Sequence, residues 1–583
     1  MAASPEQKKS YHVSKDFRGV NTKANRTAID PNEFSWLENA MPIGFSNIKI
    51  VPTRTNVSIS NTAVTWSNTA VYMCNTNIGL NDYVVVFEED GSAQYYDITT
   101  NLTGNVAVAG TFSNAGVQVS QWNNERMLII DPVKGYFTWD GNNTVSVGSI
   151  AKVNIISGGS GYNTAPNVTI SATQETGGVN ATATAVLVGN TVGSITLTEH
   201  GTGYINVANV TVTIAASPTG NNATANVTLI NQPGTAIQSF SGRVWIANGR
   251  TIYYTAAGSY NDFTSVSAGN IILNDATLHG NIQQLLSANN FLYIFGDDSI
   301  NVFSDVRVNT NGVTLFTNTN VSASVGSRLK YTIFPYFRSV LFMNDYGVYA
   351  LVGATTTKIS DPLDGIFPFI DFTKPVYAGQ VLVNNILCAA FNFYYTGNGG
   401  TGTPYNEYIT AIFFEKKWYF VNQAPDAAYI TSVPVGGRIA LFGTNGKNLI
   451  RYLNNTTDTI NCIIQTALLA MDDPIRTKQA TKFGVEATLT NAGQLNVTVD
   501  SETGSSPVYS LGNEITWINY LGNAIPWINN SSQVISWLFS SGYYLYKSDA
   551  QKYGKYLGLT ITSQSPALVL NTFEFEHELR VRF

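Results

Sequence analysis

The stretch Phe291–Phe303, FLYIFGDDSINVF, contains an apolar strand, a short polar turn and a second apolar strand. Six further stretches have the same arrangement: Tyr83–Tyr96, Arg126–Trp139, Arg243–Tyr254, Ser339–Leu351, Ile386–Tyr395 and Arg438–Tyr452. Asn-Gly, Asp-Gly, Gly-Asp and Tyr-Gly pairs at their centres suit hairpin turns, because those turns need positive φ angles. We therefore expect a β-hairpin in each of these stretches.

The hairpins recur at a nearly constant interval along the chain. Measured at the end of each first strand, the interval is 43 residues from Phe87 to Ile130, 49 from Ile246 to Phe295 and 48 from Phe295 to Met343. A repeat of about 40–50 residues that carries hairpins is typical of β-propeller blades. The sequence therefore predicts an all-β protein built on a six- or seven-bladed β-propeller.

The interval between the second and third hairpins is much longer, at 116 residues. It includes Ala151–Ile230, 80 residues rich in Gly, Asn, Thr, Ala and Val, and 36 residues remain without it. Within this segment GGSGYNTAPNVTI (Gly158–Ile170) is similar to GTGYINVANVTVTI (Gly201–Ile214), and alternating small apolar and Thr residues indicate strands. We expect a small β module at residues 151–232, inserted between two blades.

The sequence also predicts the boundaries of the other parts of the chain. We expect an N-terminal arm at 1–50, propeller blades at 51–150 and 233–455, and a β-sandwich-like C-terminal domain at 456–583. In the arm, Asp30-Pro31 predicts the start of a helical turn, with Phe34, Trp36 and Leu37 on its apolar face. The arm is expected to seal the edge of the propeller.

The C-terminal domain combines strand patterns with a tryptophan repeat. Strands are expected at Lys478–Leu489, Leu495–Val499 and Leu568–Phe583. Between them, three similar units ten residues apart place Trp517, Trp527 and Trp537 at equivalent positions. If the turns between the units preserve the register, the three indoles form one packed stripe. The alternative is that the tryptophans form a contact between subunits.

Composition limits the possible functions. Charged residues make up 12% of the chain, about half the usual share, whereas 44% of the residues are hydrophobic. A surface poor in charge is typical of proteins that cover much of their surface with neighbours. The formal net charge of −6 argues against a globally basic nucleic-acid binder. The N-terminal residues lack the apolar core of a signal peptide, and no apolar run reaches the ~18–20 residues of a membrane-spanning helix.

Residues that carry chemistry are sparse. The histidines (His12, His200, His279 and His577) and cysteines (Cys74, Cys388 and Cys462) have no metal-ligand spacing, and the cysteines suggest no disulfide framework. Asp297-Asp298 and Asp472-Asp473 are adjacent pairs, which would point to opposite faces of a strand, so we interpret them as turn residues. Gly158–Gly161 does not open a helix and is not expected to bind phosphate.

These observations favour a protein without enzymatic activity. We predict no catalytic, cofactor-binding or metal-binding residues. The Asn-x-Thr triplets are interpreted as features of turns and strands instead of glycosylation sites, because we expect no export signal.

The stretch Gln283–Ile370 resembles the tail hub or nozzle (packaged-DNA stabilisation) proteins of short-tailed bacteriophages. The similarity lies in the order of LLSANNFLYIFGDDSINVFS, a linker with a Ser-x-Gly element, and GVYALVGATTTKISDPLDGIF. The arm ending in IKIVPTRTNVS and the terminal ELRVRF resemble the entry and closing strands of that family. The inserted repeat resembles modules of phage tail proteins, but it is a departure from the hub family.

The resemblance implies a structural virion protein, assembled in the host cytoplasm and located in the tail. Such a hub forms a ring of six copies below the portal and adaptor proteins, and continues and helps to close the channel for double-stranded DNA. It attaches the tail needle, spikes or fibres and meets the host envelope on infection. No cofactor is implied.

Two other classes remain open. A phage receptor-binding or adhesin protein would bind surface glycan through the inserted module or a propeller face. Exposed aromatic residues on the module would favour it, and the module contains only Tyr162 and Tyr204. A propeller enzyme, such as a glycosidase or lyase, would need carboxylates or histidines that converge at the channel mouth, and the sequence has none at recognisable spacing.

Overall fold

The computed structural model describes residues 9–580 apart from 45–46, 274–277, 279, 401, 424–426, 472, 491–492, 513, 516, 519–523, 526, 536 and 539–542. Regular structure in these residues consists of β-strands and the short 3-10 helices η1 (Val207–Asn209), η2 (Lys330–Thr332), η3 (Asp361–Leu363) and η4 (Phe367–Phe369). The described part of the chain includes no helix long and apolar enough to cross a bilayer. The protein is all-β, as the sequence predicts.

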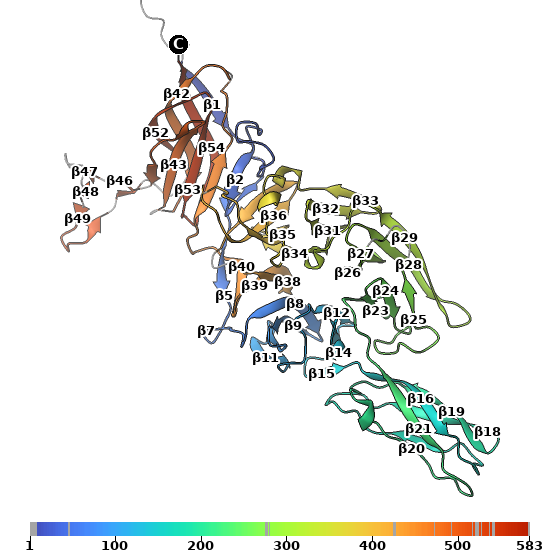
Figure 1. Ribbon diagram of the computed structural model, residues 1–583. Helices are drawn as coiled ribbons and strands as arrows, with labels where there is room; N and C mark the ends of the chain where they lie inside the picture. Colours follow the sequence, from blue (N-terminus) through green and yellow to red (C-terminus); the bar gives the residue numbers. More distant parts are fainter. Residues whose placement is uncertain are drawn as a thin grey trace, which may run out of the picture.

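Seven four-stranded blades form a ring (Figure 1). Blade 1 comprises β8 (Ala70–Ile78), β9 (Asn81–Glu88), β10 (Ala93–Asp97) and β11 (Leu102–Ala107), and blade 2 comprises β12 (Gln118–Trp122), β13 (Arg126–Asp131), β14 (Gly135–Trp139) and β15 (Thr144–Ser146). Blade 3 comprises β22 (Ala236–Phe240), β23 (Arg243–Asn248), β24 (Thr251–Tyr254) and β25 (Gly269–Ile272), and blade 4 comprises β26 (Gln284–Ala288), β27 (Phe291–Phe295), β28 (Ile300–Val308) and β29 (Thr314–Ser322). Blade 5 comprises β30 (Phe334–Tyr336), β31 (Ser339–Asn344), β32 (Gly347–Val352) and β33 (Thr355–Lys358), and blade 6 comprises β34 (Tyr377–Val383), β35 (Ile386–Tyr395), β36 (Glu407–Phe414) and β37 (Lys417–Val421).

Blade 7 closes the ring with strands from two distant parts of the chain. It comprises β38 (Tyr429–Val435), β39 (Arg438–Asn445), β40 (Asn448–Asn455) and, as its outermost strand, β5 (Thr53–Asn56). β5 pairs antiparallel with β40, and β38 packs against β8 of blade 1. The short hairpin of β6 (Ser58–Ile59) and β7 (Thr62–Ala63) then leads to blade 1. The fold is therefore a seven-bladed β-propeller.

Six of the seven predicted hairpins are the second and third strands of a blade. The seventh prediction, a hairpin within Ile386–Tyr395, is wrong, because these residues form the single strand β35. Asn392 at its centre is buried, and its side chain donates to the Ala427 carbonyl (2.8 Å) instead of supporting a turn. The turn lies earlier, at Asn384 and Asn385, both of which have positive φ.

A separate β module projects from the connection between blades 2 and 3 (Figure 1). β16 (Ser149–Ser157) pairs with β21 (Thr224–Ile230), and a four-stranded sheet contains β17 (Asn167–Ile170), β18 (Thr182–Val188), β19 (Thr191–Glu199) and β20 (Val212–Ile214). The module has its own hydrophobic core, built mainly from Val, Ile and Ala with Tyr162 and Tyr204.

The two tyrosines relate the two sequence repeats of the module. Each hydroxyl donates to a backbone carbonyl and accepts from a backbone N–H in the segment that follows the other repeat. The bonds are Tyr162 Oη to Ala215 O (3.2 Å), Ala223 N to Tyr162 Oη (2.9 Å), Tyr204 Oη to Ser171 O (3.0 Å) and Ala181 N to Tyr204 Oη (2.9 Å). The repeats therefore hold each other by equivalent exchanged contacts.

The glycines before the tyrosines have a conformation that other residues rarely adopt. Gly159 and Gly161 have φ of +63° and +79°, and Gly201 and Gly203 have φ of +69° and +80°. A Cβ at Gly159 would lie 2.4 Å from the Asn221 carbonyl oxygen, and a Cβ at Gly201 would lie 2.6 Å from the Val179 carbonyl oxygen. The Gly-x-Gly-Tyr pattern is thus a structural requirement of the module.

The C-terminal domain is a sandwich of two sheets that also contain the N-terminal arm. One sheet has β1 (Lys9–Ser14), β3 (Ala40–Ile43), β4 (Asn47–Ile50), β42 (Lys478–Thr488), β52 (Tyr543–Gly554) and β54 (Val569–Leu579). The other has β2 (Phe34–Glu38), β41 (Cys462–Thr466), β43 (Gln494–Ser501), β44 (Gly504–Ser505), β45 (Tyr509–Gly512) and β53 (Leu557–Ser563). β2 also pairs in parallel with β37, so blade 6 and this second sheet form one continuous ten-stranded sheet.

The helical turn predicted from Asp30-Pro31 is wrong. A turn is present, with Glu33 N donating to Asp30 O (2.9 Å), but the chain then enters strand β2. Phe34, Trp36 and Leu37 are buried because β2 has partners on both sides. Tertiary pairing therefore overrides the local helical signal.

The tryptophan repeat forms three short strand pairs that link the three units in a cycle. Its strands are β46 (Glu514–Ile515), β47 (Trp517–Ile518), β48 (Ala524–Ile525), β49 (Trp527–Ile528), β50 (Val534–Ile535) and β51 (Trp537–Leu538). The pairs are β46 with β51, β47 with β48 and β49 with β50. Each tryptophan lies opposite the isoleucine of another unit. The side chain of Trp527 is 48% exposed.

We predict that Tyr162→Phe and Tyr204→Phe destabilise the module to a similar extent, by ~2–4 kcal/mol, because each leaves two backbone groups without a partner. Hydrogen exchange of peptides from β16 to β21 measures the change, with Tyr346→Phe on an exposed turn of the propeller as the control. Unchanged exchange in either module variant would contradict the role of the exchanged contacts.

Candidate functional site

The innermost strands of all seven blades surround a cavity of about 460 Å³ on the propeller axis. Its lining includes glutamine and serine side chains, the rings of Tyr72, Tyr331 and Tyr377, and Lys330. A volume of this size suits a small molecule. The cavity is the point at which the propeller brings the most distant parts of the sequence together.

Polar contacts between neighbouring blades surround this cavity. Gln380 N donates to Ser432 Oγ (2.6 Å), which donates back to Gln380 O (2.8 Å) and joins blades 6 and 7. Thr431 Oγ1 donates to Asn75 Oδ1 (3.3 Å) between blades 7 and 1. Similar bonds join blades 1 and 2 through Asn77 and Gln121, blades 2 and 3 through Ser120 and Ser239, and blades 5 and 6 through Pro335 and Gln380. The polar lining therefore fixes the blades relative to one another.

Three tyrosine rings form one wall of the cavity. Tyr331 stacks on Tyr377 with ring centroids 4.7 Å apart, and Tyr72 lies 4.9 Å from Tyr331. The Tyr331 hydroxyl donates to the Val117 carbonyl (3.0 Å), which fixes helix η2 against blade 2. Burial raises the pKa of all three phenols well above the usual range, so they remain protonated at neutral pH.

Lys330 provides the only charged side chain among the described residues that line the cavity. Its Nζ lies 4.8 Å from the centroid of the Tyr331 ring, and no carboxylate of the described residues is within ion-pair distance. Desolvation lowers the pKa of Lys330 to about 8. The cavity thus combines a desolvated amine with phenol and amide groups.

A second polar cleft, of about 890 Å³, lies where the arm, blades 6 and 7 and the start of the C-terminal domain meet. It brings together Glu38, Glu407 and Asp458, which are far apart in the sequence. Glu38 Oε2 accepts from Trp36 Nε1 (2.8 Å) and Tyr405 Oη (2.6 Å), and burial raises its pKa. The bond from Tyr405 connects the arm to the loop between β35 and β36, so Glu38 helps to hold these two parts together.

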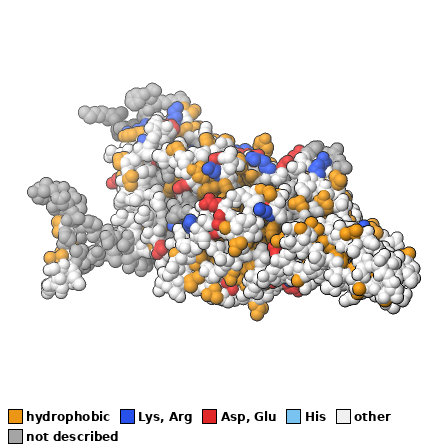
Figure 2. Space-filling view, turned by 60° about the horizontal axis from the view of Figure 1, so that its bottom comes forward, with side chains coloured by type: hydrophobic (Ala, Val, Ile, Leu, Met, Phe, Trp, Pro, Cys, Tyr) orange, Lys and Arg blue, Asp and Glu red, His pale blue; other side chains and the backbone are white. Residues whose placement is uncertain are grey.

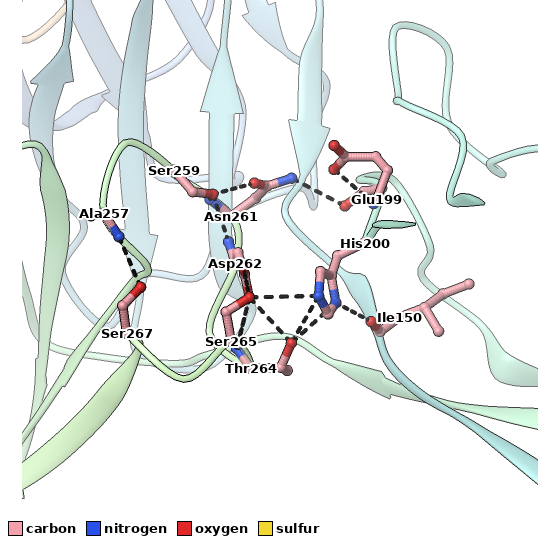
Figure 3. A network of polar contacts seen from close by, with 11 residues as sticks. Ile150, Glu199, His200, Ala257, Ser259, Asn261, Asp262, Thr264, Ser265 and Ser267 are labelled. Atoms are coloured by element: carbon pink, nitrogen blue, oxygen red, sulfur yellow. Dashed lines mark hydrogen bonds and ion pairs between the residues drawn. The ribbon is translucent and has the colours of Figure 1, made fainter. Parts of the chain in front are cut away.

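His200 lies in a polar network that joins the module to a loop of blade 3 (Figure 3). Its Nδ1 donates to the Ile150 carbonyl (2.7 Å), and its Nε2 lies 3.0 Å from Thr264 Oγ1 and 3.6 Å from Asp262 Oδ1. Burial alone would raise the pKa of Asp262, but hydrogen bonds from Ser265 and Thr264 and the charge of His200 lower it overall. Asn261 Nδ2 adds a bond to the Gly201 carbonyl (3.4 Å).

The other histidines and the acidic pairs do not converge. His12 and His577 lie on the paired strands β1 and β54, whereas His279 and Asp472 lie outside the described residues. Asp297 and Asp298 lie in the turn between β27 and β28, and Asp473 Oδ1 accepts from two backbone N–H groups of its own turn. In the described part of the chain no group of three His, Cys, Asp or Glu residues is placed to hold a metal ion.

The remaining candidates have structural positions. Gly158–Gly161 belongs to the Gly-x-Gly-Tyr turn of the module, and Cys74, Cys388 and Cys462 are buried free thiols. In the Asn-x-Thr triplets that begin at Asn180 and Asn222, each side-chain oxygen accepts a backbone N–H.

Sequence reasoning missed Lys330 and the carboxylate cleft. Lys330 occurs in RLKYTIFPYF, where one lysine beside an aromatic run gives no chemical signal. The cleft depends on β2 lying beside β37, which no local pattern indicates.

The chain was compared with family models, curated proteins and solved structures. No family model and no curated protein matches the chain. Among solved structures, the C-terminal WD40 domain of Sif2 is similar with a TM-score of 0.33 and 11% identity over 70% of this chain and 100% of that domain. BamB from Moraxella catarrhalis is similar with a TM-score of 0.30 and 11% identity over 71% of this chain and 96% of BamB.

We predict that Lys330→Met stabilises the propeller by ~1–3 kcal/mol at pH 7, because the folded protein no longer desolvates a charge. In the native chain Lys330 loses its proton near pH 8, whereas the unfolded chain keeps it to about pH 10.5. The stability of the native chain therefore rises over this window, and the advantage of the variant decreases towards zero. Denaturant unfolding at several pH values measures both effects, with Lys134→Met as the exposed control. A variant less stable than the native chain at pH 7 would contradict the analysis.

Proposed function

We propose that this chain is the hub or nozzle protein of a short bacteriophage tail, a structural virion protein that assembles into a ring. The observation that carries the proposal is the continuous ten-stranded sheet that joins blade 6 to the C-terminal domain. A connection through paired strands transmits force with little bending, which suits a protein that links successive parts of a tail. The resemblance of Gln283–Ile370 to the hub family adds support, and this stretch covers blades 4 and 5 with η3 and η4.

The surface and outline support many contacts with neighbours. The inserted module projects from the propeller, and the tryptophan repeat projects from the C-terminal domain (Figure 1). Figure 2 shows a face on which uncharged polar and apolar groups predominate and charges are scattered. Such projections and surfaces would provide attachment points for adaptor proteins, a needle, spikes or fibres.

The proposed DNA channel would lie between copies of the chain. The axial cavity of one propeller, at about 460 Å³, suits a small molecule and is too small for a DNA duplex. A ring of six copies with closed symmetry would create a wider channel on its own axis. Its low charge would limit phosphate neutralisation and so favour rapid DNA passage.

The receptor-binding alternative remains a proposal with less support. Tyr162 and Tyr204 are 2% and 1% exposed, so neither is available to stack on a sugar. Glycan could still bind to a propeller face. Among the described residues, however, we identify no exposed cluster of aromatic side chains on such a face. Screening for enzymatic activity tests the separate prediction that the chain has none.

If the proposal is correct, particles of the phage that encodes this chain hold six copies of it, all at the tail. Quantitative mass spectrometry of purified particles gives the copy number, and labelling with an antibody against the propeller gives the location. The major capsid protein provides the internal standard. Absence from the particle, or label confined to the capsid or fibre tips, would contradict the hub proposal.

A further inference from the structure

The turns between the first and second strands of the seven blades are equivalent positions of the ring, and the turn of blade 5 differs from the others. In the other six blades the turn residues with positive φ are Gly79, Asn123, Asn124, Ser241, Gly242, Asn289, Asn290, Asn384, Asn385, Gly436 and Gly437. In blade 5 the residue is Phe337, which has φ of +52° and is 73% exposed. A bulky residue rarely adopts this conformation, and such strained residues are common at binding sites. The blade 5 turn therefore points to a ligand nearby.

A pocket of about 550 Å³ lies between blades 3 and 4, beside this turn. Its lining includes Ser241 from the turn of blade 3, and Asn289 and Asn290 from the turn of blade 4. Asn289 Nδ2 donates to the Arg338 carbonyl (3.3 Å) and so joins the pocket wall to the turn of Phe337 and Arg338. A pocket of this size suits a small molecule or a segment of a longer one.

A β-bulge in β28 brings a carboxylate to the pocket. The pairing of β28 with β29 shifts register between Ser304 and Arg307, and the two bulged residues, Asp305 and Val306, both line the pocket. Asp305 has φ of +53°. Bulges re-aim side chains and are frequent beside binding sites. Arg307 donates to Asp305 Oδ2, so the other carboxylate oxygen can accept from a ligand.

The polar side chains of the pocket indicate the class of ligand. Hydroxyl, amide and carboxylate groups all form directional hydrogen bonds, and Asp305 is the only ionisable residue among the described residues of the lining. The side chains of Ser241, Ser287 and Asn290 form no hydrogen bond with any described residue, so they can bond a ligand. A molecule with many neutral hydroxyl groups matches this set, whereas the carboxylate disfavours an anion.

The aromatic residues at the pocket favour a sugar among such molecules. Phe240 belongs to the lining, and the exposed ring of Phe337 belongs to the turn that Asn289 joins to the pocket. The face of a sugar ring that carries C–H groups is apolar and packs on an aromatic ring, while its hydroxyl groups bond to polar side chains. A site with both kinds of group can hold one sugar in the pocket and a neighbouring sugar on Phe337.

We propose that the pocket between blades 3 and 4 binds a neutral saccharide. Asn290 and Asp305 bond its hydroxyl groups, and Phe337 stacks on an adjoining sugar ring. The saccharide can be a free oligosaccharide or a segment of a surface polysaccharide. The inference goes beyond the hub proposal and is independent of it, because the pocket belongs to a single propeller and its loss would leave the copy number in the particle unchanged.

Saturation-transfer NMR of the full chain, titrated with maltotriose, mannotriose and chitotriose, tests the proposal. Trigalacturonate is the acidic comparison. We expect saturable binding of at least one neutral trisaccharide, with a dissociation constant that increases at least fivefold in Asn290→Gly and in Phe337→Gly. Asn385→Gly is the matched control, because Asn385 has the equivalent position in the turn of blade 6 and φ of +65°, against +64° for Asn290. Phe337→Gly should melt no lower than the native chain, because glycine adopts a positive φ without strain.

A second arm distinguishes the source of the saccharide. Binding of a longer oligomer at least as tightly as the trisaccharide, with loss of that binding in Phe337→Gly, assigns the site to a polysaccharide segment. Binding of the trisaccharide but not of the longer oligomer assigns it to a free oligosaccharide. Binding of none of the neutral trisaccharides, or tighter binding of trigalacturonate, would overturn the proposal. Unchanged affinity in Asn290→Gly, or equal weakening in Asn385→Gly, would overturn it as well.

Discussion

The pairing of β5 with β40 is the constraint on which the rest of the structure depends. A propeller is stable as a closed ring, and here the last blade obtains its outermost strand from residues 53–56. Before that strand the chain has already supplied four strands to the sandwich sheets of the C-terminal domain. Closing the ring therefore fixes the position of the arm. The strands of the arm in turn fix the position of the C-terminal domain.

Buried contacts reinforce this dependence. Arg26 of the arm donates to the Thr466 carbonyl (2.6 Å) and the Leu559 carbonyl (3.0 Å) and forms an ion pair with buried Asp500 (2.8 Å). Removing one partner of such a pair costs ~3–5 kcal/mol, because the other charge stays buried. Trp36 of β2 stacks on Phe420 of β37 with centroids 4.3 Å apart. The arm thus supplies strands and core residues to both the propeller and the C-terminal domain. A protein that connects parts of a tail, as we propose, would need such a link.

The features predicted correctly from the sequence are those set by local chemistry. Turn residues and alternation identified six hairpins, and the Gly-x-Gly-Tyr repeat identified a module whose glycines need positive φ. The errors arose where distant partners decide the structure: Phe34–Glu38 became a strand between β37 and β41, and Ile386–Tyr395 became one strand with its turn outside it. The axial cavity could not be predicted, because the strands that line it come together only when the ring closes. The same holds for the cleft around Glu38.

The central claim is that the propeller, the arm and the C-terminal domain form one cooperative unit, with the inserted module as a separate one. Native-state hydrogen exchange of the full chain at increasing denaturant tests it directly. The account predicts that peptides from β40, β37 and β53 lose protection at the same denaturant concentration, whereas peptides from β16 to β21 open independently. Loss of protection in β53 while β40 and β37 remain protected would contradict it.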